Sequence, residues 1–417
     1  MRWKMSLVLG LALTCFGCGG DDDSNEMAGA GGMGGAGGSS VMLPEGCDAY
    51  AEPSDDDNET VQTLLIEAMP DSTVCLGEGT FRFQTELSLS VDNVTIKGAG
   101  ASSTILDFSA QDVGANGVLI SGDGTTMEDF QVLNTPGDGI RANDVDGVVF
   151  RRVNVFWEAD AETTNGAYGL YPVGSSNVII DGCVVKGASD AGIYVGQSNT
   201  ILVQNSEAYG NVAGIEIENS TDAEVVDNHA HDNTGGILVF NLPELPIKDG
   251  QRTKVHRNII ENNNLVNFGK PGSVVGNVPG GSGIIILATD NNEITGNTFR
   301  GNGSAAIIVT SYLSDIFGLY DDEEFDPYPE QNYIHANTYE GNGMMPQSIV
   351  AALELELPAP DILWDGCLPE MPGPVNCIQE DESVTFRGID YCGGFNNQTT
   401  DRTPFDCSYD ALPGQTP

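Results

Sequence analysis

The chain has 417 residues, of which 53 are glycine, and its 61 acidic against 16 basic side chains give a formal net charge of −45. The acids are spread along most of the sequence, so the protein repels nucleic acid and anionic membrane surfaces, and neither is expected as a partner. The short, glycine-punctuated apolar runs favour one continuous repeat architecture over two globular domains.

The first 18 residues have the form of an export signal. Arg2 and Lys4 precede an apolar run from Leu7 to Thr14, which is far shorter than the roughly 20 residues of a membrane-spanning helix. Gly17-Cys18 resembles a bacterial lipobox, so we expect lipidation at Cys18 and attachment to the cell envelope through that lipid, with ordinary secretion as the alternative. Residues 19–46, rich in Gly, Ala and Asp, are predicted to be a flexible tether.

Export permits disulfide bonds. We expect Cys47 to pair with Cys75 at the start of the fold, and Cys183, in an apolar strand-like run, to be a buried free thiol. The last four cysteines allow two bridges in three alternative pairings, between which the sequence does not choose: Cys367, Cys377, Cys392 and Cys407.

A short helix is predicted where the fold begins. Val61 to Met69 has apolar residues at helical spacing, Asn58 could cap it, and Pro70 ends it. Such a helix suits the exposed end of a stack, because the first turn would otherwise present its apolar interior to water.

A repeat of 22 to 23 residues then dominates the chain. Gly192, Gly214 and Gly236, each followed by isoleucine, recur at steps of 22. A turn of this length holds three short strands, so the predicted fold class is all-β: a right-handed parallel β-helix with three parallel sheets over residues 47–345. Asparagines are expected to stack at one corner of successive turns: Asn205, Asn228, Asn258, Asn297 and Asn337.

Residues 346–417 lose this periodicity and are rich in proline and cysteine. We predict that they form an extension that closes the C-terminal end of the stack and is held by disulfide bonds.

One outward-facing row of the predicted stack is unusual, because it changes from charged and aromatic to aliphatic. Its members are the candidates for a binding face: Arg141, Tyr171, Tyr194, Glu216, Glu218, Leu238, Ile285 and Ile308. Insertions at 241–252 and 311–330 are expected to fold over its aliphatic end, and insertions at 160–167 and 265–281 lie on its other side. Long loops on both sides predict a groove.

Glu216 and Glu218 lie two residues apart on one predicted strand, about 7 Å from each other. This spacing suits the acid pair of an inverting glycosidase or a calcium ion, and an ordinary solvated face is the simplest alternative.

Two further groups could bind metal. His229 and His231 share one side of a strand, near Tyr209 and Glu261 of the adjacent turns, and could begin a copper or zinc site that lacks an identified third ligand. An acidic run could bind calcium, although a solvated loop is the simpler interpretation: Asp321, Asp322, Glu323, Glu324 and Asp326. Calcium is the cofactor that the acidic groups raise, and the sequence requires none.

The repeat resembles that of the pectate-lyase-like superfamily. The Gly-His-Gly signature of polygalacturonases and the Tyr-Gly-Phe-Asp-Pro-His signature of mannuronan epimerases are both absent from the sequence. A nearer resemblance is to a family of bacterial exported β-helix proteins, and it is carried by residues 189–198, 211–219, 233–240, 326–337 and 361–366. That resemblance implies no established activity, and it implies an exported dihaem c-type cytochrome-like protein as an envelope partner.

We therefore predict a cell-envelope lipoprotein that binds a protein or glycan partner at the loop-flanked face without catalysis. The alternative is a carbohydrate-active enzyme, a polysaccharide lyase, hydrolase or epimerase, and a further alternative is the handling of copper or another metal.

Overall fold

The computed structural model describes residues 43–370 and 375–417. The predicted export signal, the lipidation candidate Cys18 and residues 19–42 of the predicted tether lie outside the described residues. In the part of the chain that is described, no helix has both the length and the apolar character needed to cross a membrane.

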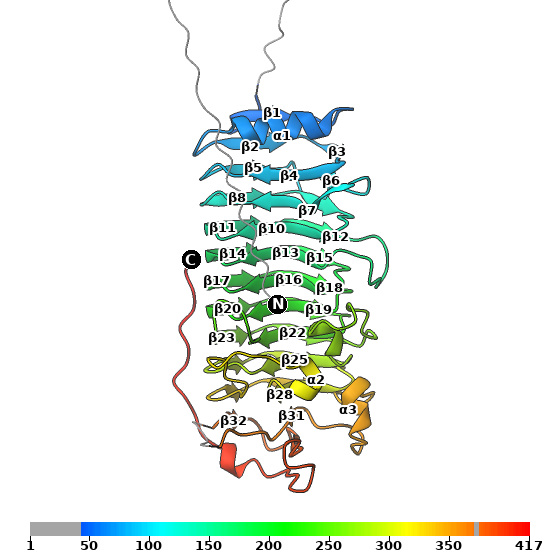
Figure 1. The fold of residues 1–417 in the computed structure, drawn as a ribbon, viewed down its shortest axis with the longest axis vertical. Coiled ribbons are helices and arrows are strands. Elements are labelled where there is room, and N and C mark those ends of the chain that lie inside the picture. Colours follow the sequence, from blue (N-terminus) through cyan, green and yellow to red (C-terminus); the bar gives the residue numbers. More distant parts are fainter. Residues whose placement is uncertain (1–42, 371–374) are drawn as a thin grey trace, which may run out of the picture. The chain divides into compact units, whose positions relative to one another are not determined.

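From residue 43 onward the chain folds as a right-handed parallel β-helix, which confirms the predicted fold class (Figure 1). Successive turns add one strand to each of three parallel sheets, here called sheets A, B and C, of 12, 10 and 11 strands. Each turn passes from sheet C to sheet A and then to sheet B.

The strands have the following bounds. Sheet A contains β1 (Ala49–Ala51), β2 (Thr73–Leu76), β5 (Thr95–Lys97), β8 (Thr125–Glu128), β11 (Asp146–Arg151), β14 (Ser176–Asp181), β17 (Asn199–Gln204), β20 (Thr221–Val226), β23 (Gln251–His256), β26 (Glu293–Thr295), β29 (Tyr333–His335) and β32 (Cys377–Gln379). Sheet B contains β3 (Gly79–Arg82), β6 (Thr104–Asp107), β9 (Gln131–Leu133), β12 (Asn154–Phe156), β15 (Val184–Lys186), β18 (Glu207–Tyr209), β21 (His229–His231), β24 (Ile259–Glu261), β27 (Thr298–Arg300) and β30 (Thr338–Glu340). Sheet C contains β4 (Thr85–Leu89), β7 (Val113–Ile120), β10 (Asp138–Asn143), β13 (Tyr168–Val173), β16 (Ala191–Gly196), β19 (Ala213–Glu218), β22 (Gly235–Phe240), β25 (Ser282–Leu287), β28 (Ala305–Thr310), β31 (Ile362–Trp364) and β33 (Phe386–Gly388).

The helices are short, and the longest covers the first turn. It is α1 (Asp57–Glu67), which begins earlier than the sequence indicated and buries Val61 and Leu65 against the stack. Asn58 lies inside this helix and hydrogen-bonds Gln84 and Thr85 instead of capping it. The others are η1 (Val275–Asn277), α2 (Ser314–Phe317), α3 (Ser348–Ala352) and η2 (Thr403–Phe405).

The interior of the stack is filled by the aliphatic residues that alternation predicted. Ile193, Ile215 and Ile237 follow one another through the pairing of β16, β19 and β22, and all three are fully buried. Each such side chain contributes about 1.5–3 kcal/mol to folding through removal from water. Cys183 is a free, buried thiol in this interior, as expected.

Asparagine ladders close the corners of the turns. Between sheets A and B, the side-chain amide of Asn228 donates to Asn258 at 3.0 Å, Asn258 donates to Asn297 at 3.0 Å, and Asn297 donates to Asn337 at 3.0 Å. The side-chain oxygens of Asn258, Asn297 and Asn337 also accept the backbone N–H of the ladder asparagine in the preceding turn. Buried donors and acceptors are therefore paired where the chain bends.

The prediction for Asn205 is wrong. Its side chain is exposed and hydrogen-bonds Asp181, and the neighbouring Ser206 takes the place in the ladder by donating its backbone N–H to Asn228. Two further ladders were not predicted from the sequence, one between sheets B and C and one between sheets C and A. Their members are Asn211, Asn233, Asn263, Asn302 and Asn342 in the first, and Asn292, Asn332 and Asn376 in the second.

The stack extends beyond the predicted boundary at residue 345. Strands β31 and β33 extend sheet C, and β32 extends sheet A, so periodic structure reaches Gly388. Long connections between these strands hide their period in the sequence. In the described residues, disulfide bonds join Cys47 to Cys75, Cys367 to Cys392 and Cys377 to Cys407, which confirms the first prediction and decides the pairing of the last four cysteines.

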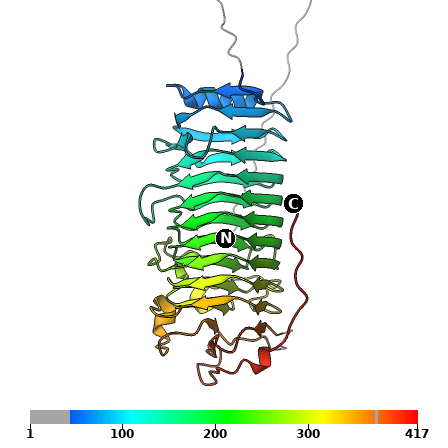
Figure 2. The ribbon, with the colours of Figure 1, turned by 180° about the vertical axis from the view of Figure 1, so that it is seen from behind.

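The last residues return along the outside of sheet A (Figures 1 and 2). The backbone of Leu412 accepts the Lys254 ammonium at 2.7 Å, and the backbone N–H of Gln415 donates to Glu224 at 2.6 Å. The C-terminal segment therefore covers part of sheet A as well as the end of the stack.

We expect Asn258→Ala to lower the free energy of unfolding by roughly 2–4 kcal/mol, because the buried backbone N–H of Asn228 and the carbonyl of Val225 lose their side-chain partner. Asn199→Ala removes an exposed asparagine from a neighbouring sheet and should change stability by no more than about 0.5 kcal/mol. Chemical denaturation of both variants tests the ladder, and equal losses would contradict it.

Candidate functional site

The predicted outward row exists and is in register across sheet C. Arg141 pairs with Tyr171, Tyr194 with Glu216, and Leu238 with Ile285. The pairing of Leu170 with Ile193 sets Tyr171 beside Tyr194, and the pairing of Ile285 with Ile308 completes the row. We call the series from Arg141 to Ile308 the outer row.

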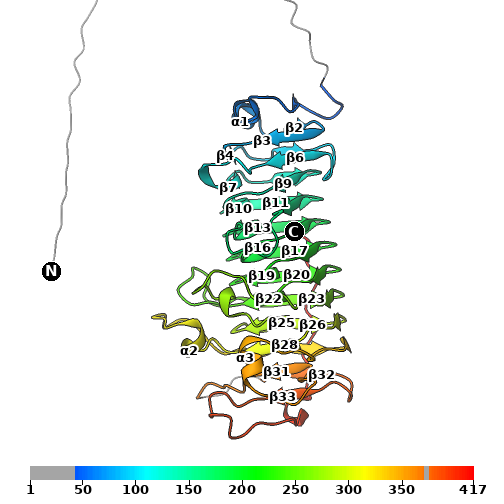
Figure 3. The same ribbon diagram turned by 90° about the vertical axis from the view of Figure 1, so that its right-hand side faces the viewer.

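Loops cover most of the outer row, so its central residues are buried and do not form an accessible face. Tyr194, Glu216 and Leu238 are 4%, 1% and 0% exposed, and Ile285 is 4% exposed. The loops at 241–250, 264–281 and 311–330 pack on them and make a second apolar core outside the sheet (Figure 3). The loop residues in this core include Val275, Val278, Tyr312 and Phe325.

The insertions at 241–252 and 311–330 do fold over the aliphatic end, as predicted. Burial of Leu238, Ile285 and the aromatic loop residues is favourable for the same reason as burial in the stack interior. Only the two ends of the outer row stay half-buried, with Arg141 and Tyr171 at one end and Ile308 at the other.

A group of carboxyl and phenol side chains lies at the polar end of the outer row. We call Tyr168, Asp190, Tyr194, Glu216 and Glu218 the acid–tyrosine cluster. The Tyr194 hydroxyl donates to Glu218 Oε1 at 2.6 Å. A Cβ atom at Gly196 would overlap that hydroxyl, so glycine there lets the tyrosine lie across the strand to reach the next turn.

The prediction that Glu216 and Glu218 belong to an ordinary solvated face is wrong, since they are 1% and 8% exposed. Glu216 Oε2 is buried without a hydrogen-bond partner. Asp190, which sequence reasoning missed, is half-buried at the start of β16 and interacts electrostatically with both glutamates.

Burial makes these carboxyls hard to ionise. It raises the pKa of Glu218 to about 7, against the opposing effect of the Tyr194 hydrogen bond. Burial, with the charges of Glu218 and Asp138, raises the pKa of Asp190 to about 7. Burial, then Glu218 and Asp190, raises the pKa of Glu216 well above its ordinary value. At neutral pH the cluster therefore holds protons that exposed carboxyls would have released.

Three tyrosines form the wall of the cluster. The ring centroid of Tyr168 lies 4.5 Å from that of Tyr171 and 4.6 Å from that of Tyr194. The guanidinium of Arg141 lies over the Tyr171 ring at 4.9 Å and donates to Asn143 at 2.8 Å. Arg141 and Tyr171 are half-buried and thus form the open edge of the group.

An apolar cavity of about 90 Å³ lies at the other end of the outer row. Ile285 and Ile308 line its floor on sheet C, and side chains of α2 and α3 line its sides, among them Ile316 and Ile349. Ile349 is 36% exposed, so the cavity opens to solvent beside α3.

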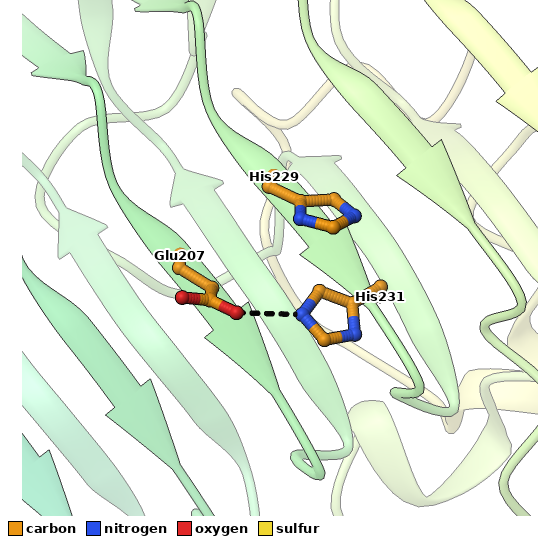
Figure 4. Close-up of side chains that lie close together, drawn as sticks. All are labelled: Glu207, His229 and His231. Carbon is orange, nitrogen blue, oxygen red and sulfur yellow. Dashed lines mark hydrogen bonds and ion pairs between the residues drawn. The ribbon is translucent and has the colours of Figure 1, made fainter.

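The predicted histidine group lies on sheet B. His229 Nε2 is 3.0 Å from Glu261 Oε1, and the His231 ring stacks on Tyr209 with centroids 5.2 Å apart, so both predicted neighbours are confirmed. The structure adds Glu207, whose Oε1 is 2.9 Å from His231 Nε2 (Figure 4). Glu207 precedes His229 by one 22-residue turn, which is the signal that could have identified it.

The acidic run does not gather as a calcium site. Asp322 accepts the Lys248 ammonium at 2.7 Å and the backbone N–H of Glu244 at 2.7 Å, and it thereby ties two covering loops together. The Lys248 hydrogen bond lowers the pKa of Asp322. Asp321, Glu323 and Glu324 extend toward solvent. Within residues 43–370 and 375–417, metal-ligating atoms of three side chains converge within 4.8 Å only at Glu207, His229 and His231.

Comparison with known proteins supports the fold. Residues 116–264 match the family model described as the right handed beta helix region. The A-module of the mannuronan C-5 epimerase AlgE4 from Azotobacter vinelandii is 16% identical, with 80% of this chain and 93% of that chain covered and a TM-score of 0.51. The A-module of AlgE6 from the same organism is 16% identical, with 80% and 92% covered and a TM-score of 0.52. A search of the curated proteins gave no match.

Similarity at this level shows a shared fold and no more. DFA-IIIase from Arthrobacter chlorophenolicus A6 is also similar, with 12% identity, 81% and 93% of the two chains covered and a TM-score of 0.47. Because the two epimerase modules share the fold at only 16% identity, the chemistry of this chain has to be argued from its own residues.

The raised pKa of Glu218 makes stability depend on pH. Between its ordinary value of 4.5 and its folded value of about 7, the folded protein keeps a proton that the unfolded chain has released, so raising the pH lowers the free energy of unfolding. The amide of Glu218→Gln can still accept the Tyr194 hydroxyl but does not titrate. The free energy of unfolding of this variant should therefore fall by roughly 1–3 kcal/mol less than that of the wild type between about pH 5 and about pH 8. Denaturant unfolding at both pH values measures the effect, and Glu356→Gln, an exposed site, serves as the control.

Proposed function

We propose that the protein is a carbohydrate-active enzyme that acts on a neutral glycan at the acid–tyrosine cluster, with Asp190 and Glu218 as the proton-transferring pair. The observation that supports it is a set of three desolvated carboxyls beside three tyrosines. Two of the carboxyls, those of Asp190 and Glu218, have pKa values raised to about 7. Of the alternatives named from the sequence, enzymatic activity on glycan is the one that this geometry favours.

A structural role alone accounts poorly for these acids. In the same row, Leu238 and Ile285 fill equivalent positions under the loops with apolar side chains at no cost in desolvation. Glu216 is buried with Oε2 unpaired, which costs about 1–3 kcal/mol. Destabilising acids kept together in this way are typical of functional sites.

The pair can supply one acid and one base at neutral pH. Like charges on Asp190 and Glu218 oppose ionisation of both, so the pair holds about one proton when each pKa is near 7. The protonated carboxyl can donate to a departing glycosidic oxygen while the ionised one activates water, which is the division of labour in glycoside hydrolysis. Burial, with the charges of Glu218 and Asp190, raises the pKa of Glu216 well above its ordinary value, so Glu216 stays protonated beside the pair.

Substrate would approach at the open edge. Tyr171 and Arg141 are half-buried there, and an aromatic ring beside a guanidinium can stack on a sugar ring and hydrogen-bond its hydroxyls. A net charge of −45 and the acids of the cluster repel polyuronates, so hydrolysis of a neutral glycan is favoured over elimination or epimerisation on an acidic one.

We expect release of reducing sugar from a member of a neutral-glycan panel, with a pH optimum set by the pair. Glu218→Gln and Asp190→Asn should each lower the rate by about 100- to 10,000-fold, because each removes one partner of the proton transfer. Glu356→Gln should retain the wild-type rate. Full activity in either cluster variant, with all three proteins folded, would contradict the assignment.

A second candidate is binding of an envelope partner without catalysis, which the apolar cavity favours. Its lining is made mainly of aliphatic and aromatic side chains, and the cavity opens to solvent at Ile349. An aliphatic or aromatic side chain of a partner protein, such as the exported c-type cytochrome-like protein implied by the sequence resemblance, could fill it. The proposed setting is the cell envelope, with lipid attachment at Cys18, and the three disulfide bonds are consistent with an oxidising compartment.

For this candidate, Ile349→Asp places a charge at the mouth of the cavity. The substitution should abolish cross-linking to the partner in envelope preparations, because the apolar contact with the partner would have to bury the new carboxylate. Leu319→Asp alters an apolar residue that is 93% exposed and outside the cavity, so cross-linking should persist. Identical cross-linked products from both variants and the wild type would exclude the cavity as the docking site.

A further inference from the structure

The outer face of sheet B carries a set of metal-ligating side chains on a different sheet from the acid–tyrosine cluster. Strand pairing places Glu207 beside His229, and Tyr209 beside His231. On the next turn, Glu261 lies beside His231. Figure 4 shows the two imidazole rings one above the other, with Glu207 reaching toward them from the neighbouring strand. The two ring centroids are 4.1 Å apart.

We propose that Glu207, His229 and His231 bind one divalent metal ion of the zinc and copper class. Two imidazoles and one carboxylate are the donor set of open three-ligand sites for these ions, in which water completes the coordination. Calcium and magnesium prefer sites made of oxygen alone. One ligand atom from each side chain already lies within 4.8 Å of the others. Donor atoms around tetrahedral zinc are about 3.4 Å apart, so small side-chain rotations suffice to close the site.

Neighbouring residues hold both imidazoles in place. Asp232 Oδ2 lies 2.7 Å from His231 Nδ1, and Glu207 Oε1 lies 2.9 Å from Nε2, so a metal ion bound at Nε2 would leave the Nδ1 proton hydrogen-bonded to Asp232. A carboxylate on the far nitrogen is the usual partner of a metal-binding histidine. The stacking of His231 on Tyr209, with planes 7° apart, further restricts the ring. Glu261 engages His229 Nε2 and leaves Nδ1 for coordination.

The local charge also favours a cation. Glu207, Asp232 and Glu261 contact the two rings. The guanidinium of Arg300, which pairs with Glu261 at 2.9 Å, is shared with Glu340 at 2.8 Å. Carboxylates around neutral imidazoles lower the free energy of a bound divalent ion.

The other two histidines supply a comparison within the same protein. His256 contacts Glu224 at 2.7 Å, but it also contacts the guanidinium of Arg257 at 3.1 Å. His335 contacts Glu293 at 3.0 Å, and that glutamate is already paired with Lys254. Each of these histidines has a carboxylate partner without a second imidazole, so neither should bind metal.

The proposal is tested by titrating the full chain, free of any histidine tag, with zinc in competition with a chromophoric chelator. Excess calcium and magnesium occupy the exposed carboxylates. We expect one tight site per chain, and His229→Asn and His231→Asn should each weaken it at least about 10-fold. Asp232→Asn should weaken it about 10- to 100-fold by releasing the His231 ring. His335→Asn is the matched control and should bind as the wild type does. Thermal unfolding confirms that each variant is folded.

Binding of cobalt in place of zinc gives a second readout, because coordination by imidazole changes its visible spectrum, and this change should be absent from the His229 and His231 variants. Absence of a stoichiometric zinc site in the wild type would overturn the proposal. Equal zinc affinity in the wild type and both histidine variants would also overturn it, because the bound ion would then be held elsewhere.

Discussion

The parallel hydrogen bonding between successive turns is the constraint on which the rest of this structure depends. Because each strand pairs with its counterpart one turn away, every side chain lies above a residue fixed by the register. Three corners per turn then recur at fixed places, where Asn and Ser side chains satisfy the buried backbone groups. A single register thus sets the interior, the corners and the outward rows together.

The same register gives the three sheets different outer surfaces. On sheet C, aliphatic and aromatic residues stack outward and are covered by loops that form a second apolar core. On sheet A, the C-terminal segment covers Lys254 and Glu224. On sheet B, His229, His231 and Glu207 remain partly exposed. Covering one face raises carboxyl pKa values through desolvation, whereas leaving another open keeps imidazoles available to ions.

Burial is what gives the acid–tyrosine cluster its chemistry. Glu216 and Glu218 on an exposed strand would be ordinary ionised carboxylates, and burial raises the pKa of both. The likeness to the epimerase modules is one of fold, and the sequence lacks the Tyr-Gly-Phe-Asp-Pro-His signature expected from mannuronan epimerases. The proposed activity therefore depends on the burial, charge and contacts of Asp190 and Glu218 in this chain.

The sequence alone determined the β-helix, its inward aliphatics, the outer row and one corner ladder, because period and alternation follow from hydrogen bonds between neighbouring turns. Only the tertiary structure decided that loops bury Tyr194 and Glu216, because aperiodic insertions carry no register and their packing depends on the whole surface they meet. The pairing of the last cysteines and the strands after residue 345 were hidden for the same reason. The shift from Asn205 to Ser206 and the approach of Glu207 to His231 depend on corner geometry and side-chain direction, which a repeat length does not specify.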